Sequence, residues 1–346
     1  MRMVDSHFHW YPRAVFEQLF RERKGHPWAR SNGKGGYSIV SRLGVAGIGP
    51  WAEFFDLDAE FAHMDTTGHQ VYVICSIGPF SGQFSELPAQ EGRDVATSWN
   101  EEMASAQRNH SGRFWGSAAV PLLDAKIAIE VLDHAVDKLG LVGVNIPGSV
   151  GRDERMDAER LEPFYDRVEQ LGVPLFVHPN DDVLEDLLGD YDGALYLSLG
   201  RVIDVSVSGM RLVLSGIMER HPDLKVFISH TGGALPYQSG RMDKNSGAAR
   251  LPQPPSTYLK RMYTDTVSPH TLGMKFAIEY YGADHVMYGS DYPCWSPAAA
   301  LKLFGEIGLS SGDQEKIFGA NARHVFGLRD TPKPRVQQDA RDPARV

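Results

Sequence analysis

Short apolar runs alternate along the chain with longer stretches in which apolar residues recur every three to four positions. The short runs are typical of buried β-strands, and the longer stretches are typical of helices that cover them. We predict strands at residues 3–9, 71–77, 114–120, 141–146, 174–178, 225–230, 262–265 and 285–291. We predict helices at residues 56–67, 94–110, 125–138, 158–171, 203–220, 234–244, 271–281 and 312–326. This alternation favours a parallel (β/α)8 barrel, the TIM-barrel fold.

An open, doubly wound sheet is the competing arrangement of alternating strands and helices. That fold would need a glycine-rich phosphate loop after the first strand. The chain instead reads "VDSHFHWYPR" at this point, with His7 and His9 at the strand end. We therefore interpret residues 1–329 as a single barrel domain.

Two segments do not follow the barrel pattern. Residues 11–55 are rich in glycine and aromatic residues and show no sustained periodicity. We predict that they form a small insertion after the first strand, folded over the barrel mouth as a lid or as a dimer contact. Residues 330–346 are rich in Pro, Arg and Asp and contain few large apolar side chains. This composition predicts a disordered tail.

Charge and composition narrow the class of protein. The 346 residues carry a net charge of −9 without a basic run, which argues against a nucleic acid or an anionic membrane as partner. No apolar stretch approaches the ~20 residues needed to span a bilayer, and no signal-peptide pattern precedes the first strand. The chain has only two cysteines, Cys75 and Cys294, which is typical of a reducing compartment. We expect a cytoplasmic enzyme or small-molecule binder.

The histidine pair on the first strand could bind a metal ion. Side chains alternate between the faces of a strand, so His7 and His9 point the same way and lie ~7 Å apart along the backbone. Two imidazole nitrogens at this separation can meet one ion at about 2 Å from each. Taken alone, the pair could equally hydrogen-bond to neighbouring loops.

Three further polar residues end predicted strands. They are His178 in "PLFVHPND", His230 in "VFISHTGG" and Asp291 in "VMYGSDYP". A TIM barrel places its active site at the carboxyl ends of the strands, and closure brings the eighth strand beside the first. These residues are therefore predicted to join the histidine pair at one metal centre. His270, near the end of the seventh strand, is a candidate for a residue that supports the metal ligands without binding the ion.

The donor set indicates which metal the centre would hold. Imidazole and carboxylate ligands without a thiolate suit Zn²⁺, with Mn²⁺ or Fe²⁺ as alternatives. The fourth strand, "LVGVNIP", ends in neither Lys nor Glu, so nothing there would bridge a second ion. We predict one Zn²⁺ ion with an open position for water. Cys294, three residues after Asp291, is interpreted as a small packing residue near the mouth of the barrel.

Several longer segments resemble a known family. They are "HFHWYPR", "FVHPND", "LVLSGIMERHPDLKVFISHTGGALPYQSGRMD", "PPSTYLKRMYTDT" and "VMYGSDYP". Together they resemble the amidohydrolase superfamily, and more closely its branch of non-oxidative decarboxylases that includes 2-amino-3-carboxymuconate-6-semialdehyde decarboxylase. The resemblance spans residue 4 to about residue 328.

The resemblance implies a role for each matching residue. His7, His9, His178 and Asp291 would bind Zn²⁺, and His230 would act as an acid/base or stabilising residue beside the metal-bound water. Arg241 matches an arginine that reaches a substrate carboxylate across a dimer interface, which implies a homodimer.

One position departs from the family pattern. The decarboxylase has a second substrate-binding arginine in the insertion, whereas this chain has Ile48 and Gly49 in "GIGPW". An Arg–carboxylate contact is worth about 1.5–3 kcal/mol. The loss of this arginine suggests that the substrate differs from 2-amino-3-carboxymuconate-6-semialdehyde, which is doubly acidic.

Two enzymatic functions and one non-catalytic function remain open from the sequence. In the first, a metal-bound water, His230 and Asp291 drive decarboxylation of a small unsaturated or aromatic carboxylic acid. In the second, the same residues hydrolyse an amide, lactone or ester. The third function is a non-catalytic barrel that only binds a metal ion or a ligand. Binding alone would not explain a proton carrier, His230, beside an open metal position. Aromatic residues of the insertion and its flanks, with Trp10 as the predicted substrate contact, suggest a flat ligand.

Overall fold

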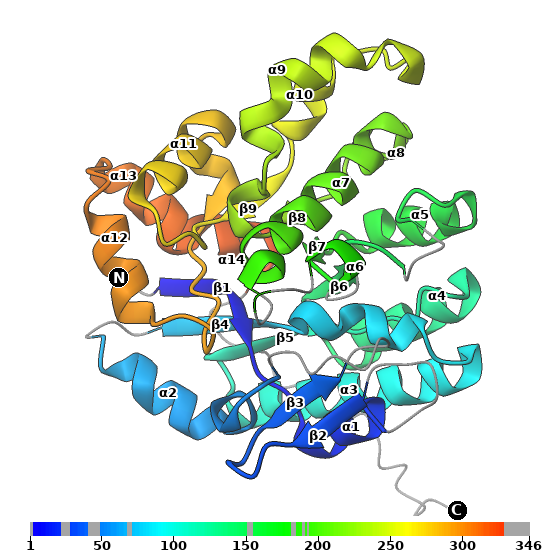
Figure 1. Cartoon of the computed structure of the whole chain (residues 1–346), viewed down its shortest axis with the longest axis vertical. Helices are drawn as coiled ribbons and strands as arrows, with labels where there is room; N and C mark the ends of the chain where they lie inside the picture. Colours follow the sequence, from blue (N-terminus) through cyan, green and yellow to red (C-terminus); the bar gives the residue numbers. More distant parts are fainter. Residues whose placement is uncertain are drawn as a thin grey trace, which may run out of the picture.

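Eight parallel strands form the centre of the protein in the described part of the chain (Figure 1). The computed structural model describes residues 3–21, 28–40, 49–67, 71–150, 155–180, 185–188, 191 and 194–328. The strands are β1 (Met3–His9), β4 (Val71–Ser76), β5 (Phe114–Ala118), β6 (Gly143–Pro147), β7 (Leu175–His178), β8 (Val226–Ile228), β9 (Tyr263–Asp265) and β10 (Val286–Met287). Each strand pairs in parallel with its neighbour in this order.

Backbone hydrogen bonds close the sheet between β1 and the residues that follow β10. Ser6 donates its N–H to the carbonyl of Tyr288 at 2.9 Å, and His9 donates to Tyr292 at 2.9 Å. Asp291 donates to the carbonyl of His7 at 2.8 Å. The predicted (β/α)8 barrel is therefore confirmed, and its closure brings Asp291 to the carboxyl end of β1.

A layer of large apolar side chains fills the barrel below this end. Val4, Ile74, Trp115, Phe176 and Phe227 belong to one buried cluster, to which the last helix also contributes. The rings of Phe176 and Phe227 stack with centroids 4.5 Å apart. Such layers are the normal filling of a TIM barrel and make it a packed core rather than a pore. They give the polar residues above them a rigid apolar floor.

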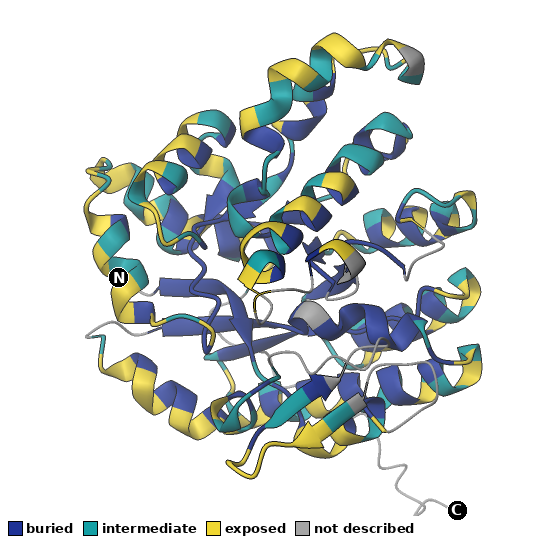
Figure 2. Cartoon of the chain, viewed as in Figure 1, coloured by how far each residue is buried: buried dark blue, intermediate teal, exposed yellow. Residues whose placement is uncertain are grey.

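Helices surround the barrel and turn their buried faces towards it (Figure 2). The longer helices are α2 (Leu57–Asp65), α3 (Ala89–Asn109), α4 (Ala125–Asp133), α5 (Glu162–Leu171), α7 (Arg201–Leu214), α9 (Leu235–Asn245), α11 (Thr271–Tyr281) and α12 (Pro297–Gly305). The shorter ones include α6 (Glu185–Leu188), α8 (Ile217–Arg220), α10 (Pro255–Leu259), α13 (Ser311–Glu315) and α14 (Asn321–Val325). Asp124 caps the start of α4 by accepting from two backbone N–H groups, and Gly172 ends α5 at φ 66°.

The insertion after β1 has structure of its own. It contains α1 (Arg13–Leu19), an antiparallel hairpin of β2 (Trp28–Ser31) and β3 (Tyr37–Val40), and the short helix η1 (Ala52–Phe55). Aromatic stacking joins parts of the insertion to one another, because the ring of Tyr11 lies 5.1 Å from that of Phe54 in η1 and 5.8 Å from that of Phe16 in α1. The hairpin strands are four residues each, too short for their periodicity to be recognised in the sequence.

Several predictions fall outside the described residues. They concern the tail at 330–346, part of the insertion and Ile48 within it. Among the described residues, no helix is both long enough and apolar enough to cross a membrane.

A buried carboxyl on α2 leads to a prediction about pH and stability. Glu60 is 0 % exposed, and neither of its oxygens has a hydrogen-bond partner in the described part of the chain. Burial raises the pKa of Glu60 well above its usual 4.5. The folded state therefore binds more protons than the unfolded state above pH 4.5, so this group lowers stability as pH rises from there. Glu60→Gln is expected to raise the free energy of unfolding at pH 8 by roughly 1–3 kcal/mol.

Urea denaturation at pH 5 and pH 8 checks this prediction. The gain from Glu60→Gln should be larger at pH 8, whereas Glu102→Gln on the exposed face of α3 should change neither value. A gain that is equal at both pH values would contradict a titrating carboxyl as its cause.

Candidate active site and metal centre

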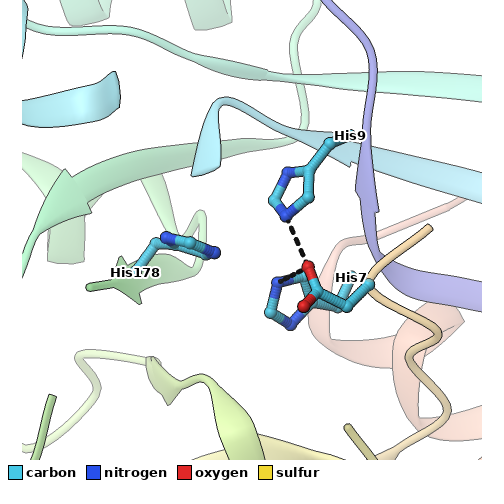
Figure 3. Close-up of side chains that lie close together, drawn as sticks. His7, His9 and His178 are labelled. Carbon is cyan, nitrogen blue, oxygen red and sulfur yellow. Dashed lines mark hydrogen bonds and ion pairs between the residues drawn. The ribbon is translucent and has the colours of Figure 1, made fainter. Parts of the chain in front are cut away.

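Three histidines and one aspartate converge at the carboxyl end of the barrel. His7 and His9 come from β1, His178 ends β7, and Asp291 follows β10. One ligand atom from each of these buried residues lies within 4.8 Å of the others. Figure 3 shows the imidazoles of the three histidines gathered around a common point. The four residues predicted as metal ligands are therefore brought together, although 284 positions separate the first from the last.

Each histidine is oriented through its Nδ1 atom. The contacts are His7 to Asp265 Oδ2 at 2.7 Å, His9 to the carbonyl of Ser76 at 3.2 Å, and His178 to the carbonyl of Pro179 at 3.0 Å. Carbonyl and carboxylate oxygens can only accept, so each Nδ1 carries a hydrogen, and in the neutral form of each ring Nε2 then keeps its lone pair for a cation. This outer hydrogen bond on a ligating histidine is the usual arrangement in metal sites.

The ring nitrogens on the inner side fit a metal ion. Nε2 of His7 and Nε2 of His178 are buried and have no hydrogen-bond partner in the described part of the chain. Leaving a buried acceptor unsatisfied costs about 1–3 kcal/mol. An ion bound by these nitrogens, Nε2 of His9 and Asp291 would satisfy them, and three imidazoles with one carboxylate form a set that suits Zn²⁺ or Mn²⁺.

Asp291 connects the histidines to one another. Its Oδ1 lies 2.9 Å from Nε2 of His9 and 3.4 Å from Nε2 of His7, and its Oδ2 lies 3.7 Å from Nε2 of His230. Asp291 and His230 both have positive φ, 58° and 56°. Non-glycine residues adopt this region at a cost of about 1 kcal/mol or more, and such strain is concentrated at functional sites.

Burial and charge set the protonation of the cluster. Burial lowers the pKa of His9 and lowers that of His178 well below its usual value, so both are neutral and able to bind a cation. Burial also acts to lower the pKa of His7, but Asp291 and Asp265 outweigh it and the net pKa is raised. Burial acts to raise the pKa of Asp291, and the neighbouring histidines reverse this effect and hold it well below its usual value.

Asp265 is a site residue that the sequence predictions missed. It ends β9, and its carboxylate accepts from His7 Nδ1 and from the backbone N–H groups of His230 (3.1 Å), Thr231 (2.9 Å) and Val267 (3.0 Å). It therefore holds a ligand and the segment of His230 in fixed positions. Its place at the end of a predicted strand was the one sequence feature that pointed to it, and this feature is weak because aspartate is also common in turns.

Asp265→Asn is expected to lower the affinity for the metal ion about 10- to 100-fold, because the amide no longer provides a carboxylate acceptor for His7 Nδ1. Competition of the purified protein against a fluorescent zinc chelator measures this affinity. Asp58→Asn, which changes a carboxylate that is 89 % exposed, is the matched control and should leave the affinity unchanged. Equal affinities of Asp265→Asn and the unchanged protein would contradict the orienting role.

A cavity of about 610 Å³ adjoins the cluster. The residues that line it include Tyr11, Trp51, Phe54, Phe80, Leu197, Ser198, Arg201, Val202, His230, Thr231, Val267, Asp291, Cys294 and Trp295. Most of these side chains are apolar or aromatic, and the insertion supplies one wall. A volume of this size is normal for a small-molecule site. The polar groups at its base, His230 and Asp291, are the predicted catalytic residues.

Two expectations from the sequence are wrong. His270 is exposed and its Nδ1 accepts from the backbone of Gly273 at the start of α11, so it caps that helix instead of supporting the ligands. Cys294 lies near the mouth of the barrel as expected, but it is exposed and lines the cavity instead of serving as a packing residue.

The two predicted substrate contacts lie outside the cavity in a single chain. Arg241 is exposed on α9, and its carbonyl accepts from Asn245 at 2.9 Å. Trp10 is half-buried and packs edge-on against Phe114 at 5.9 Å between ring centroids. Contact of Arg241 with substrate across a dimer, and of Trp10 with substrate, stay predictions.

Comparison with known proteins places this site in a family. Residues 4–328 match the amidohydrolase family. The chain belongs to this family. It is 29% identical over 253 residues to gamma-resorcylate decarboxylase of Rhizobium sp. (strain MTP-10005), covering 68% of this chain and 76% of the relative. It is 25% identical over 284 residues to 2-amino-3-carboxymuconate-6-semialdehyde decarboxylase of Dictyostelium discoideum, covering 79% of this chain and 77% of the relative.

Among solved structures, the fold is similar to dihydroxybenzoic acid decarboxylase from Polaromonas sp. JS666 with bound manganese and the inhibitor 2-nitroresorcinol. The TM-score is 0.76 at 22% identity, and the match covers 94% of this chain and 97% of the other. The family and the decarboxylase branch predicted from the sequence are therefore confirmed.

Proposed function

We propose that this chain is a metal-dependent non-oxidative decarboxylase of a small aromatic carboxylic acid. The observation that carries this proposal is the convergence of His7, His9, His178 and Asp291 beside an aromatic-lined cavity that Asp291 also lines. Two of the imidazole nitrogens in this cluster have no hydrogen-bond partner among the described residues. The relatives add support, because both of those described above are named as decarboxylases and neither is named as a hydrolase. They favour decarboxylation over the hydrolase alternative.

The metal of this proposal is one Zn²⁺ ion, with Mn²⁺ as the alternative. The three imidazoles favour Zn²⁺, whereas the Polaromonas structure carries manganese. When bound, such an ion polarises an oxygen that coordinates it. The metal content of purified protein, and turnover after reloading with each ion, distinguish the two metals.

The residues of the chain supply the proton and the position of the substrate. The aromatic walls hold the ring of the acid, and His230 faces the same space from the end of β8 with 13 % of its side chain exposed. His230 donates a proton to the ring carbon that carries the carboxylate, forming a C–H bond. The bond between this carbon and the carboxylate then breaks, its electron pair restores the aromatic π system, and CO₂ leaves. Asp291, 3.7 Å from His230, assists the transfer and the return of a proton from solvent.

A panel of ortho-hydroxy and ortho-amino aromatic acids tests the proposal. Metal-loaded protein in D₂O should release CO₂ and place one deuterium at the carbon that carried the carboxylate. A parallel panel of esters, lactones and amides in ¹⁸O-water tests hydrolysis. Release of CO₂ from none of the acids, together with ¹⁸O in a product carboxylate, would establish the hydrolase instead.

Two further parts of the proposal concern assembly and location. We expect a homodimer in which the exposed Arg241 of one copy faces the site of the other, and sedimentation analysis at several concentrations measures this. The small number of cysteines supports a cytoplasmic location.

A further inference from the structure

One permanently charged cation lies in the wall of the cavity. Arg201 opens α7, directly after the short helix η6 (Tyr196–Gly200), and of the described residues that line the cavity it is the only lysine or arginine. The mechanism above gives it no role. A guanidinium beside apolar and aromatic side chains binds anions more strongly than one in open solvent, because competing water is reduced.

A second polar group in the same wall also points to a ligand. Tyr11 is 1 % exposed, lines the cavity, and its hydroxyl has no hydrogen-bond partner in the described part of the chain. Its ring lies 6.4 Å from that of His9, which places it beside the metal centre. Arg201 lines the same cavity as Tyr11. Together they offer a hydroxyl and a guanidinium to one oxygen-rich group.

The change of charge during decarboxylation indicates which group of the substrate Arg201 and Tyr11 bind. The carboxylate that departs loses its negative charge as CO₂ forms, so a cation held on it would stabilise the substrate more than the transition state. A cation on a second group, whose charge does not change, has no such cost and only increases binding. The planar fork of arginine matches the two oxygens of a carboxylate.

We propose that Arg201, with the Tyr11 hydroxyl, binds a second carboxylate of the substrate, so that the enzyme prefers aromatic dicarboxylic acids over monocarboxylic acids. This inference rests on the proposed decarboxylase function for its chemistry, but it concerns binding. The sequence predicts the loss of a cation from the insertion, where "GIGPW" replaces an arginine. Arg201 supplies a cation to the cavity from a different element, the start of α7.

Binding without turnover tests the proposal. Isothermal titration of zinc-loaded protein compares benzoate with benzene-1,3-dicarboxylate and benzene-1,4-dicarboxylate. We expect at least one dicarboxylate to bind about 10- to 100-fold more tightly than benzoate. Arg201→Met should abolish this preference and leave the affinity for benzoate unchanged, and Tyr11→Phe should reduce it about three- to tenfold.

Two variants keep the result interpretable. Arg201→Lys retains a charge without the fork and should keep part of the preference, so it replaces Arg201→Met if the methionine variant does not fold. Lys275→Met removes a surface cation of α11 that is 52 % exposed and should change no affinity.

The outcomes separate this inference from the proposed function. Equal affinity of the unchanged protein for benzoate and both dicarboxylates, or an equal loss for all three acids in Arg201→Met and Arg201→Lys, would overturn the role of Arg201. A preference that depends on Arg201, combined with no release of CO₂ from any acid of the panel, would reject the proposed function and leave the binding role intact.

Discussion

Replacing His178 with alanine is expected to remove tight binding of the divalent ion and, with it, turnover. His178 provides one of three imidazole Nε2 atoms, and in the described part of the chain this atom has no partner other than the predicted ion. Removing a residue that hydrogen-bonds to a metal ligand already lowers metal affinity about 10- to 100-fold. Removing the ligand itself should therefore lower the affinity by more than about 100-fold. Metal analysis after dialysis against a weak chelator should find wild-type protein loaded and His178→Ala empty.

A stability measurement checks the same prediction without turnover. A ligand at 100 times its Kd stabilises the folded state by about 2.7 kcal/mol. Addition of Zn²⁺ or Mn²⁺ should therefore raise the melting temperature of the wild-type protein and of His134→Ala, which changes an exposed histidine outside the cluster. His178→Ala should show no such rise. An unchanged metal content in His178→Ala would show that the ion, if bound, lies elsewhere.

The barrel could be predicted from the sequence because its strands are buried on both faces. β1 is buried along its whole length and has the bounds that were predicted, Met3–His9. A strand that is buried on both faces appears in the sequence as a continuous apolar run. The helices between these runs have three or more turns and show apolar residues every three to four positions. The later strands are shorter than predicted, as in β10 with two residues, because the chain turns away from the sheet to form the site.

The metal ligands could be predicted because of their residue type and position, whereas Asp265 was missed because its residue type is common at that position. Histidines at strand ends are chemically conspicuous, and closure of the barrel gathers them at one rim. An aspartate at a strand end is also a common turn residue, so Asp265 gave no distinct signal. His270 illustrates the converse error, because a position near a strand end does not determine the direction of a side chain, and this one caps a helix.

The walls of the cavity could not be predicted in the same way. Arg201 lines it from the first position of α7, and Leu197 lines it from η6 directly before, where the sequence has no regular period and a helix was predicted only from residue 203. Which side chains meet in such a region depends on how several loops pack together. That the Tyr11 hydroxyl has no hydrogen-bond partner among the described residues likewise depends on its surroundings in the fold, which the sequence does not reveal.

Replacing His230 with asparagine is expected to leave metal binding intact and to lower kcat by about 10²- to 10⁴-fold, the usual contribution of a general acid. His230 lies beside the four clustered ligands without being one of them, because its Nε2 faces Asp291 Oδ2 at 3.7 Å and its Nδ1 contacts Ser229 Oγ at 3.0 Å. Asparagine is chosen because His230 has a φ of 56°, and asparagine tolerates this region better than other non-glycine residues.

The combination of measurements distinguishes a proton donor from a structural residue. Metal content, melting temperature and affinity for benzoate should match those of the wild-type protein, while release of CO₂ and uptake of deuterium fall together. His270→Asn makes the same substitution near the next strand end, at a residue that is exposed and outside the lining of the cavity, and should retain full activity. If His230→Asn instead lost the metal ion, His230 would belong to the ligand set.

The His178→Ala and His230→Asn variants together locate the chemistry within the cluster. Loss of the ion and of turnover in His178→Ala, with loss of turnover alone in His230→Asn, would divide the site into residues that hold the ion and a residue that moves the proton. Asp291 lies within 3.7 Å of nitrogens from both sets, so its carboxylate is the group through which the two functions are coupled. This coupling follows from barrel closure, because only closure brings the end of β10 to the end of β1.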